Sequence, residues 1–269
     1  MSTIGFVGSG NMAEALVKGI IAAKMYAPEN VLVSDVRVER VDFLSANYGA
    51  VAVQSNAELA AKADTVVLSI KPQMMTEALS SIKDSIRPEA LVISIAAGIK
   101  VAKIAAVLGD MAIVRVMPNT PALIGEGTSA LFANEKAKPL LKKAMSVFTS
   151  VGKAVVVDNE DLIDAVTAVS GSGPAYYFLL MEEMIKSGVE LGLPEAVAKD
   201  LVLQTAKGAG MLAAAADRNG ESPAQLRQKV TSPGGTTEAA LKVFAEGNMG
   251  KLISAAIARA RDRARELSK

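Results

Sequence analysis

Short apolar runs alternate with amphipathic segments over the first 157 residues of the chain. The runs at 65–70 and 91–95 are uninterrupted, which is typical of parallel strands buried on both faces of a sheet. The segments between the runs carry apolar residues three and four positions apart, which predicts helices. Regular alternation of strand and helix predicts a doubly wound α/β sheet. The predicted strands are 4–7, 30–35, 50–53, 65–70, 91–95, 112–117, 128–133 and 153–157, and the predicted helices are one from about residue 12, then 38–48, 55–62, 73–86, 101–108 and 135–149.

The pattern changes at Asp158, and from there on helical periodicity replaces the strand-like runs. We therefore predict two domains, 1–159 with the sheet and 160–269 with helices alone. The predicted helices are 162–191 with an interruption at 170–174, 194–216, one that begins at Pro223, 236–244 and 248–267.

The predicted helices of the second domain are unusually apolar. Residues 175–181 are hydrophobic on all sides, and 206–216 are dense in Ala and Gly. A helix of this kind needs to be buried on every side, and about 110 residues of helix provide little material to surround it. We predict that this domain packs against its copy in a homodimer, the commonest closed symmetry. The alternative is a compact monomeric bundle.

The composition of the chain excludes several kinds of catalytic site. The chain has 269 residues with no Cys and no His, so a thiol nucleophile, a disulfide, a Cys/His zinc site and a Ser-His-Asp triad are excluded. We expect no metal site. Lys plus Arg number 29 and Asp plus Glu 28, so we expect no nucleic-acid partner. The apolar stretch 91–108 is interrupted by Gly98, Lys100 and Lys103, so we expect no membrane span. The absence of Cys fits an intracellular protein, and we expect it in the cytoplasm.

The first strand ends in Gly8-Ser9-Gly10, and a helix follows at once, so that the small residues read G-x-G-x-x-A. Gly8 allows the tight turn, Gly10 lets the backbone approach a pyrophosphate, and Ala13 lets the helix pack close to the strand. The helix N-terminus offers free N–H groups to the phosphates. A dinucleotide site is the favoured interpretation, and an ordinary strand–helix turn is the alternative.

The other strand ends carry small, polar or turn residues, as a crevice at the carboxyl edge of a sheet requires. Asp35 ends the second strand, where an acid would bond the adenosine ribose hydroxyls and favour NAD. Arg37 and Arg40 follow it and either hold a 2′-phosphate or belong to a solvated helix face. The sequence leaves the choice between NAD and NADP open.

A second glycine-rich stretch, 231–237, lies far along the chain. Gly234 and Gly235 followed by the hydroxyls of Thr236 and Thr237 make another anion nest at a helix start. The carboxylate of a small substrate can take these N–H groups and leave a Thr hydroxyl for the reacting atom. A plain turn with Thr as N-cap is an equally good interpretation of this stretch alone.

Seven motifs in order resemble those of the pyrroline-5-carboxylate reductase family over essentially the whole chain. The resemblance implies an N-terminal Rossmann-type doubly wound domain, an all-α C-terminal dimerisation domain, and reduction of 1-pyrroline-5-carboxylate to L-proline by NADH or NADPH. It also implies a site completed across a dimer, with dimers that often assemble further into decamers. The motifs are 8–13, 70–72, 94–98, 117–121, 161–167, 170–176 and 230–237, of which the last is specific to the family.

The resemblance assigns roles to matching positions, and Thr237 is the one it makes catalytic, with its hydroxyl bonded to the ring nitrogen of the substrate. The residues that the resemblance assigns to substrate binding are Glu160, Ser232, Gly235, Thr236 and Thr237. The residues for the cofactor are Gly8, Ser9, Gly10, Asn11 and Met12 at the pyrophosphate, Ser34, Asp35 and Asn56 at the adenosine ribose, and Ile70, Lys71, Pro72, Ala96 and Ala97 toward the nicotinamide.

Two alternatives belong to other classes. A β-hydroxyacid dehydrogenase needs a Lys three residues beyond a helix-borne G-x-G-x-x pattern, but after Gly171 and Gly173 the next Lys is Lys186. A non-enzymatic nicotinamide-binding regulator is the other alternative, and the 231–237 turn favours catalysis over it. Two stretches depart from the family pattern. The second strand ends in Ser34-Asp35, where NADP-preferring relatives often have uncharged small residues. Gln228 and Lys229 replace polar residues that usually include an acid.

Overall fold

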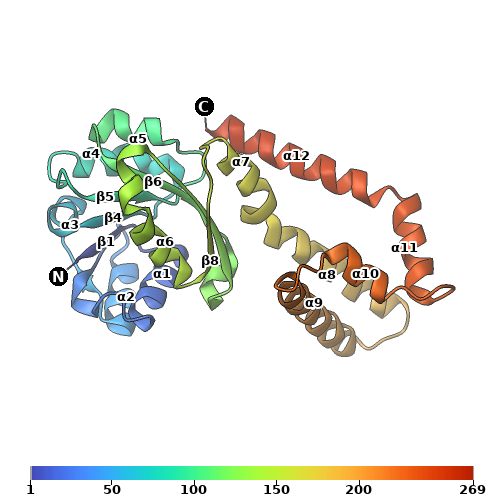
Figure 1. The fold of residues 1–269 in the computed structure, drawn as a ribbon. Helices are drawn as coiled ribbons and strands as arrows, with labels where there is room; N and C mark the ends of the chain where they lie inside the picture. Colours follow the sequence, from blue (N-terminus) through green and yellow to red (C-terminus); the bar gives the residue numbers. More distant parts are fainter. Residues whose placement is uncertain (1, 269) are drawn as a thin grey trace. The chain divides into compact units, whose positions relative to one another are not determined.

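The structure, a computed structural model, describes residues 2–268, and its N-terminal part contains one eight-stranded sheet in the order β3-β2-β1-β4-β5-β6-β7-β8 (Figure 1). The order places the first strand, β1, between β2 and β4, so the topological switch point lies at β1. The predicted doubly wound sheet is thus confirmed. The strands are β1 (Ile4–Val7), β2 (Val31–Ser34), β3 (Val51–Ala52), β4 (Thr65–Leu68), β5 (Leu91–Ser94), β6 (Ala112–Met117), β7 (Gly127–Ala133) and β8 (Gly152–Val156).

One strand pair departs from the parallel arrangement. β7 runs antiparallel to β6, whereas every other neighbouring pair is parallel. The chain between β6 and β7 contains only the 3₁₀ turn Thr120–Ile124. A parallel crossover needs a dozen or more residues and usually a helix, so this short connection turns the chain back on itself.

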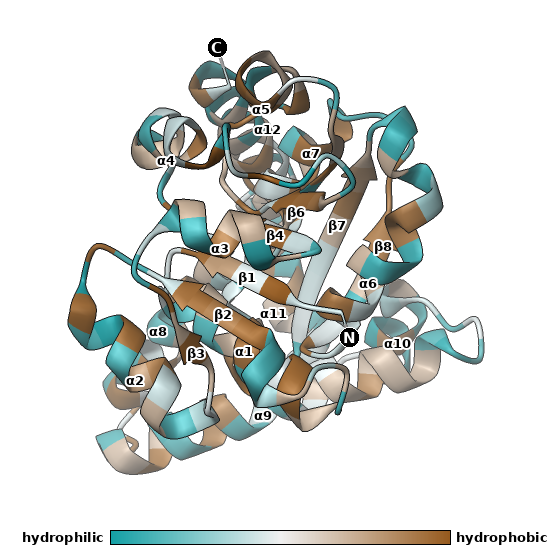
Figure 2. Ribbon diagram, turned by 90° about the vertical axis from the view of Figure 1, so that its left-hand side faces the viewer, coloured by the Kyte–Doolittle hydropathy of each residue, from teal (hydrophilic) through white to brown (hydrophobic). Residues whose placement is uncertain are grey.

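Helices cover both faces of the sheet. α1, α2 and α6 share one buried cluster with the strands, and α3, α4 and α5 share the other. Successive strand residues alternate between the two clusters, as Phe6 and Val7 do. In Figure 2 the strands are mostly brown, and the covering helices turn teal sides outward. These helices are α1 (Asn11–Ala22), α2 (Val38–Tyr48), α3 (Asn56–Lys62), α4 (Met75–Ile82), α5 (Val101–Leu108) and α6 (Leu141–Thr149).

From Asp158 onward the described residues contain no strand, in line with the prediction. The expected interruption of the long helix is a π-helical turn at Thr167–Gly171, slightly earlier than the predicted 170–174. The helices are α7 (Leu162–Val166), α8 (Gly173–Glu190), α9 (Glu195–Asp217), α10 (Pro223–Lys229), α11 (Thr236–Glu246) and α12 (Met249–Leu267).

The chain forms two compact units whose limits differ from the predicted boundary at 159/160. The first unit runs to Pro174 and includes the end of α12 from Arg259, and the second is Ala175–Ala258. α7 stays with the sheet because Ile163 and Asp164 are buried, and because Asp164 lies 3.4 Å from the buried guanidinium of Arg115 on β6. The end of α12 lies against the loop after β5, where a Cβ on Gly98 would come within 2.7 Å of the Leu267 carbonyl oxygen.

The second unit has almost no core within one chain. Of its described residues, only Ala198, Val202 and Ala216 are buried apolar side chains. Tyr177 and Phe178 on α8 remain 67% and 60% exposed. The apolar faces of α8 and α9 are therefore left uncovered by the chain itself. None of the helices described between residues 2 and 268 is long and apolar enough to cross a lipid bilayer.

Candidate functional site

The turn between β1 and α1 has a shape that glycine alone permits. Gly8 has φ +95°, and a Cβ at this position would lie 2.6 Å from the Ser69 carbonyl oxygen. Any other residue would be strained at this positive φ, and its Cβ would clash with Ser69, which directly follows β4. The tight turn that the sequence motif predicts at Gly8 is therefore present.

Side chains from three other segments fix the backbone of this turn. The Ser69 hydroxyl donates to the Gly8 carbonyl at 2.6 Å. The Ser9 N–H donates to the Asp35 carboxylate at 2.7 Å, and the Arg40 Nε donates to the Ser9 carbonyl at 2.9 Å. Each of these groups sets the direction of one edge of a peptide plane, so the turn is rigid before any ligand arrives.

The N-terminus of α1 fits a phosphate group. Gly10 is the N-cap and has no side chain to bond the first-turn N–H groups, which also lack partners within a helix. A Cβ on Gly10 would meet no atom within 4 Å. Open space above unpaired N–H groups at the positive end of a helix suits the pyrophosphate of a dinucleotide.

A hydrogen-bonded chain lies at the end of β2. The Ser34 hydroxyl donates to the Asn56 side-chain oxygen at 2.6 Å, and the Asn56 amide donates to the Ser81 hydroxyl at 3.0 Å. Asp35 follows Ser34 directly, so the three residues predicted for the adenosine ribose lie together beside the glycine turn.

Asp35 is held as a carboxylate. Burial alone would raise the pKa of its carboxyl group, but the N–H groups of Ser9 and Arg37 and the Arg37 guanidinium outweigh it and lower the pKa below its ordinary value. The Arg37 Nε lies 3.2 Å from Asp35 Oδ1. Since the pKa is lowered, Asp35 is ionised over the whole physiological range and acts there as an acceptor only.

Arg40 is not part of a solvated helix face, which is one of its two expected roles. Its side chain is 21% exposed, and its guanidinium bonds the Ser9 carbonyl and the Glu14 carboxylate. Arg37, in contrast, is 55% exposed. Sequence reasoning missed both Arg40 and Ser69 as supports of the turn. Ser69 could have been found, because a hydroxyl at the end of the strand next to the switch point reaches the glycine turn.

The residues predicted toward the nicotinamide lie at the ends of the two strands beyond β1. Ile70, Lys71 and Pro72 follow β4, and Ala96 and Ala97 follow β5. Parallel pairing of β1, β4 and β5 brings these segments to the same edge of the sheet as the glycine turn. The structure thus gathers all the predicted cofactor positions along one carboxyl edge.

Glu160, which is predicted to bind the substrate, lies in the first unit and is hydrogen-bonded to other residues of that unit. Its Oε1 accepts the Val101 N–H at the start of α5 at 2.8 Å and lies 3.2 Å from the Arg115 guanidinium. Its side chain is 19% exposed. The carboxylate is therefore oriented by the sheet and by α5.

The other predicted substrate residues lie in the second unit, at the start of α11. Gly234 has φ +70°, and its N–H donates to the Glu238 carboxylate at 2.7 Å. Gly235 is the N-cap of α11 and bonds the Ser232 carbonyl at 3.0 Å. The Thr237 side chain is half-buried in the first turn. The turn predicted as an anion nest is thus a glycine-capped helix start with free first-turn N–H groups.

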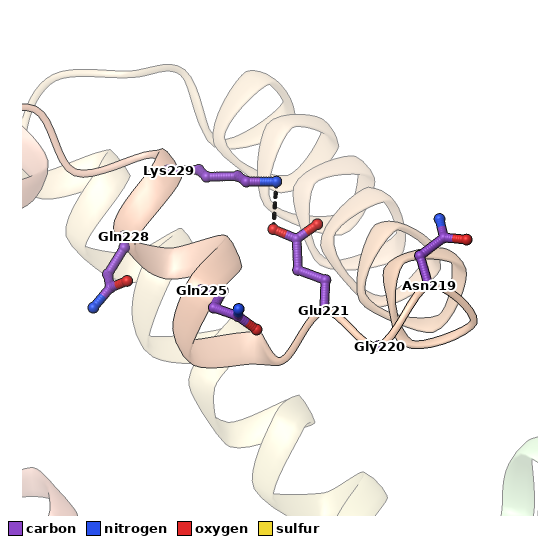
Figure 3. A pocket seen from close by; sticks show the side chains of 6 residues that line it. All are labelled: Asn219, Gly220, Glu221, Gln225, Gln228 and Lys229. Carbon is purple, nitrogen blue, oxygen red and sulfur yellow. Dashed lines mark ion pairs between the residues drawn. The ribbon is translucent and has the colours of Figure 1, made fainter.

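A shallow polar pocket lies shortly before this turn in the chain (Figure 3). Lys229 and Glu221 form an ion pair across it, and the Ser222 and Gln225 side chains cap α10. Lys229 is one of the two positions that depart from the family pattern, and the ion pair gives it an internal partner. The lining residues are Asn219, Gly220, Glu221, Gln225, Gln228 and Lys229.

Comparison with known proteins decides the family. A model described as pyrroline-5-carboxylate reductase dimerisation matches residues 160–267, and one described as NADP oxidoreductase, coenzyme F420-dependent, matches residues 3–98. The chain is 44% identical to the pyrroline-5-carboxylate reductase of Pseudomonas aeruginosa, over 100% of this chain and 98% of that relative. The chain belongs to the pyrroline-5-carboxylate reductase family.

Solved structures of pyrroline-5-carboxylate reductases have the same fold. The protein from Coxiella burnetii is 42% identical and superposes with a TM-score of 0.92, covering 100% of this chain and 99% of that one. The Plasmodium falciparum protein, solved with NADP bound, is 31% identical with a TM-score of 0.87, covering 100% and 98%. Family membership confirms an oxidoreductase that uses a nicotinamide dinucleotide and sets aside the hydroxyacid dehydrogenase and the regulator.

The space above Gly10 leads to a prediction. Gly10→Ala leaves the free energy of unfolding within about 1 kcal/mol of the parent, because the Cβ meets no protein atom. It fills the space that a phosphate needs, an overlap that costs about 1–3 kcal/mol, so the Kd for NADPH rises about ten- to hundredfold. Isothermal titration of NADPH, together with urea denaturation, measures both quantities.

Gly8→Ala is the contrasting variant. Its positive φ and its clash with Ser69 destabilise the fold itself by about 1–3 kcal/mol, so stability and affinity fall together. An affinity of Gly10→Ala equal to that of the parent would mean that the phosphates do not approach the chain at this helix start.

Proposed function

We propose that the chain reduces 1-pyrroline-5-carboxylate to L-proline, the last step of proline biosynthesis, with NADH or NADPH as reductant. The observation that carries the proposal is the presence, in one chain of this family, of two glycine-capped helix starts. α1 follows Gly8 and Gly10, and α11 follows Gly234 and Gly235. One suits the phosphates of a dinucleotide and the other suits the carboxylate of a small substrate.

The reaction balances with few demands on the protein. A bound NADH or NADPH would supply the hydride for C5 of the imine and would leave as NAD⁺ or NADP⁺. The electron pair of the C=N bond would pass to nitrogen, which would keep or gain one proton. A protonated imine is already electrophilic, so no strong acid is needed. A chain without His or Cys can contribute by orientation and by hydrogen bonds directed at the reacting nitrogen.

The first unit would hold and orient the cofactor. Gly8 to Met12 would bond the pyrophosphate, Ser34, Asp35 and Asn56 would lie at the adenosine ribose, and the segments after β4 and β5 would extend toward the nicotinamide. The support is their common place at the carboxyl edge of the sheet. The last of these segments are Ile70-Lys71-Pro72 and Ala96-Ala97.

The 232–237 turn would bind the substrate. Ser232 and the N–H groups of Gly235, Thr236 and Thr237 would hold its carboxylate, and the Thr237 hydroxyl would bond the ring nitrogen. Glu160 would act as a second anchor, oriented by Arg115 and Val101. The support is the helix-start geometry of the turn together with the family motif.

The proposed function is tested by one assay. Purified protein is expected to oxidise NADH or NADPH only when pyrroline-5-carboxylate is added, and to produce no NADH or NADPH from a 3-hydroxyacid with the oxidised cofactor. Cofactor binding without oxidation in the presence of pyrroline-5-carboxylate would contradict the proposal.

Thr237→Ala is expected to lower kcat more than tenfold, through loss of one transition-state hydrogen bond worth roughly 2–3 kcal/mol. Thr237→Ser keeps the hydroxyl and is the matched control, expected to retain most of the activity. The measurement is steady-state kcat with saturating cofactor. A turnover of Thr237→Ala within twofold of the parent would remove this hydroxyl from the mechanism.

Asp35→Ser is expected to shift preference toward NADPH. An ionised carboxylate favours ribose hydroxyls and repels a 2′-phosphate, so its loss should raise the ratio of kcat/KM for NADPH to that for NADH by about tenfold or more. The variant also removes the hydrogen bond from the Ser9 N–H to Asp35 and so loosens the turn. This loosening weakens the binding of both cofactors alike, so it does not change the ratio. An unchanged ratio would mean that Asp35 does not face the ribose.

We also propose that the chain works as a homodimer, able to assemble further into decamers, in the cytoplasm. The support is the family's dimerisation match and the exposed apolar faces of α8 and α9, including Tyr177, Phe178 and Leu212. Light scattering after size exclusion is expected to give the mass of two chains, or of ten if dimers associate. The mass of a single chain would contradict the proposal.

A further inference from the structure

Arg40 is bonded at two points, one in the cofactor turn and one in the helix that follows the turn. Its Nε donates to the Ser9 carbonyl at 2.9 Å, and its Nη2 donates to the Glu14 carboxylate of α1 at 2.7 Å. The guanidinium also lies over the Phe43 ring, 5.0 Å from its centroid. One side chain of α2 therefore links the turn to the first helical turn of α1.

Glu14 is itself held from a second direction. Its Oε1 accepts the Tyr48 hydroxyl at 3.1 Å, while its Oε2 accepts Arg40. Arg40 and Glu14 are only 21% and 25% exposed. A planar guanidinium that bonds two fixed acceptors loses little freedom per bond and holds a direction better than an ammonium would.

The bond to the Ser9 carbonyl has a consequence for the neighbouring N–H. In a planar trans peptide the C=O and the following N–H point in opposite directions. Arg40 holds the carbonyl of the peptide that joins Ser9 to Gly10, so the Gly10 N–H points away from Arg40. Gly10 is the N-cap of α1, and fixing its peptide plane orients this N–H relative to the first-turn N–H groups of the helix.

We propose that Arg40 is a positioning residue for the dinucleotide: it holds the Ser9–Gly10 peptide so that the Gly10 N–H and the first N–H groups of α1 converge on the pyrophosphate. The role does not depend on a 2′-phosphate, because NADH and NADPH share the pyrophosphate. It rests on the proposed function only in taking these two cofactors as ligands.

The test is direct binding of NADH and of NADPH to the full-length protein without substrate, followed by cofactor fluorescence. Arg40→Met keeps an unbranched side chain against Phe43 and removes both bonds. The Kd values for NADH and NADPH are each expected to rise about tenfold, as loss of a charge-assisted hydrogen bond to the turn implies. The ratio of the two Kd values should change less than twofold, and kcat at saturating cofactor should stay near the parent value.

Arg87→Met is the matched control. Arg87 also bonds two acceptors, Asp64 and Glu89, but it precedes β5 and so lies at the amino edge of the same sheet. This variant should lose stability to a similar extent, measured as the midpoint of thermal unfolding, and bind both cofactors like the parent. Weakened binding by Arg87→Met would show that general destabilisation explains the loss and would overturn the proposal.

Two further outcomes would overturn it. Weaker binding of NADPH with unchanged binding of NADH would mean that Arg40 contacts the 2′-phosphate directly. Binding of both cofactors within twofold of the parent would mean that the peptide keeps its direction without Arg40.

If Arg40→Met does not fold, the Kd values of Arg40→Lys test the proposal in its place. One ammonium does not span both acceptors, so this variant should show an intermediate rise for both cofactors, and parent-like affinity would contradict the two-point link.

Discussion

The direction of two peptide planes at the Gly8–Gly10 turn is the constraint on which the first unit's chemistry depends. Backbone N–H groups bind a phosphate only if they converge on it, and a glycine turn left to itself has wide conformational freedom. Here Ser69, Asp35 and Arg40 each hold one edge of these planes, from three different segments of the chain. The sheet order that brings β1 between β2 and β4 makes this possible. The fold thus supplies a prepared anion site, and helix α1 supplies its charge.

The second unit differs from the first, because the apolar faces of its helices are not covered within one chain. Its apolar faces on α8 and α9 stay exposed, and its buried apolar side chains are few. The hydrophobic effect penalises such a surface strongly, and self-association is the simplest way to remove it. In this account the sheet provides cofactor binding, and the helical unit provides the contacts between chains together with the substrate turn.

Much of this organisation could be predicted from the sequence. The uninterrupted run at 65–70 and the G-x-G-x-x-A turn at Gly8 depend on local patterns, and the structure has a strand and a tight turn there. Contacts between distant residues carry no such pattern. Nothing local distinguishes Arg40 from Arg37, although Arg40 reaches across to Glu14 and Ser9 while Arg37 remains largely exposed. The antiparallel pairing of β7 depends on the length of a connection rather than on strand residues, and the packing of α7 against Arg115 explains why the compact units do not divide at residue 159.

The central claim is that the protein catalyses one hydride transfer, from a bound nicotinamide to the imine carbon. The most direct measurement uses NADH and NADPH in parallel, each with deuterium at the transferred position of the nicotinamide ring, together with unlabelled pyrroline-5-carboxylate. Mass spectrometry and NMR of the product should find one deuterium at C5 of L-proline for each reduced cofactor oxidised. Oxidation of either cofactor without deuterium in proline, or oxidation of neither, would contradict the account.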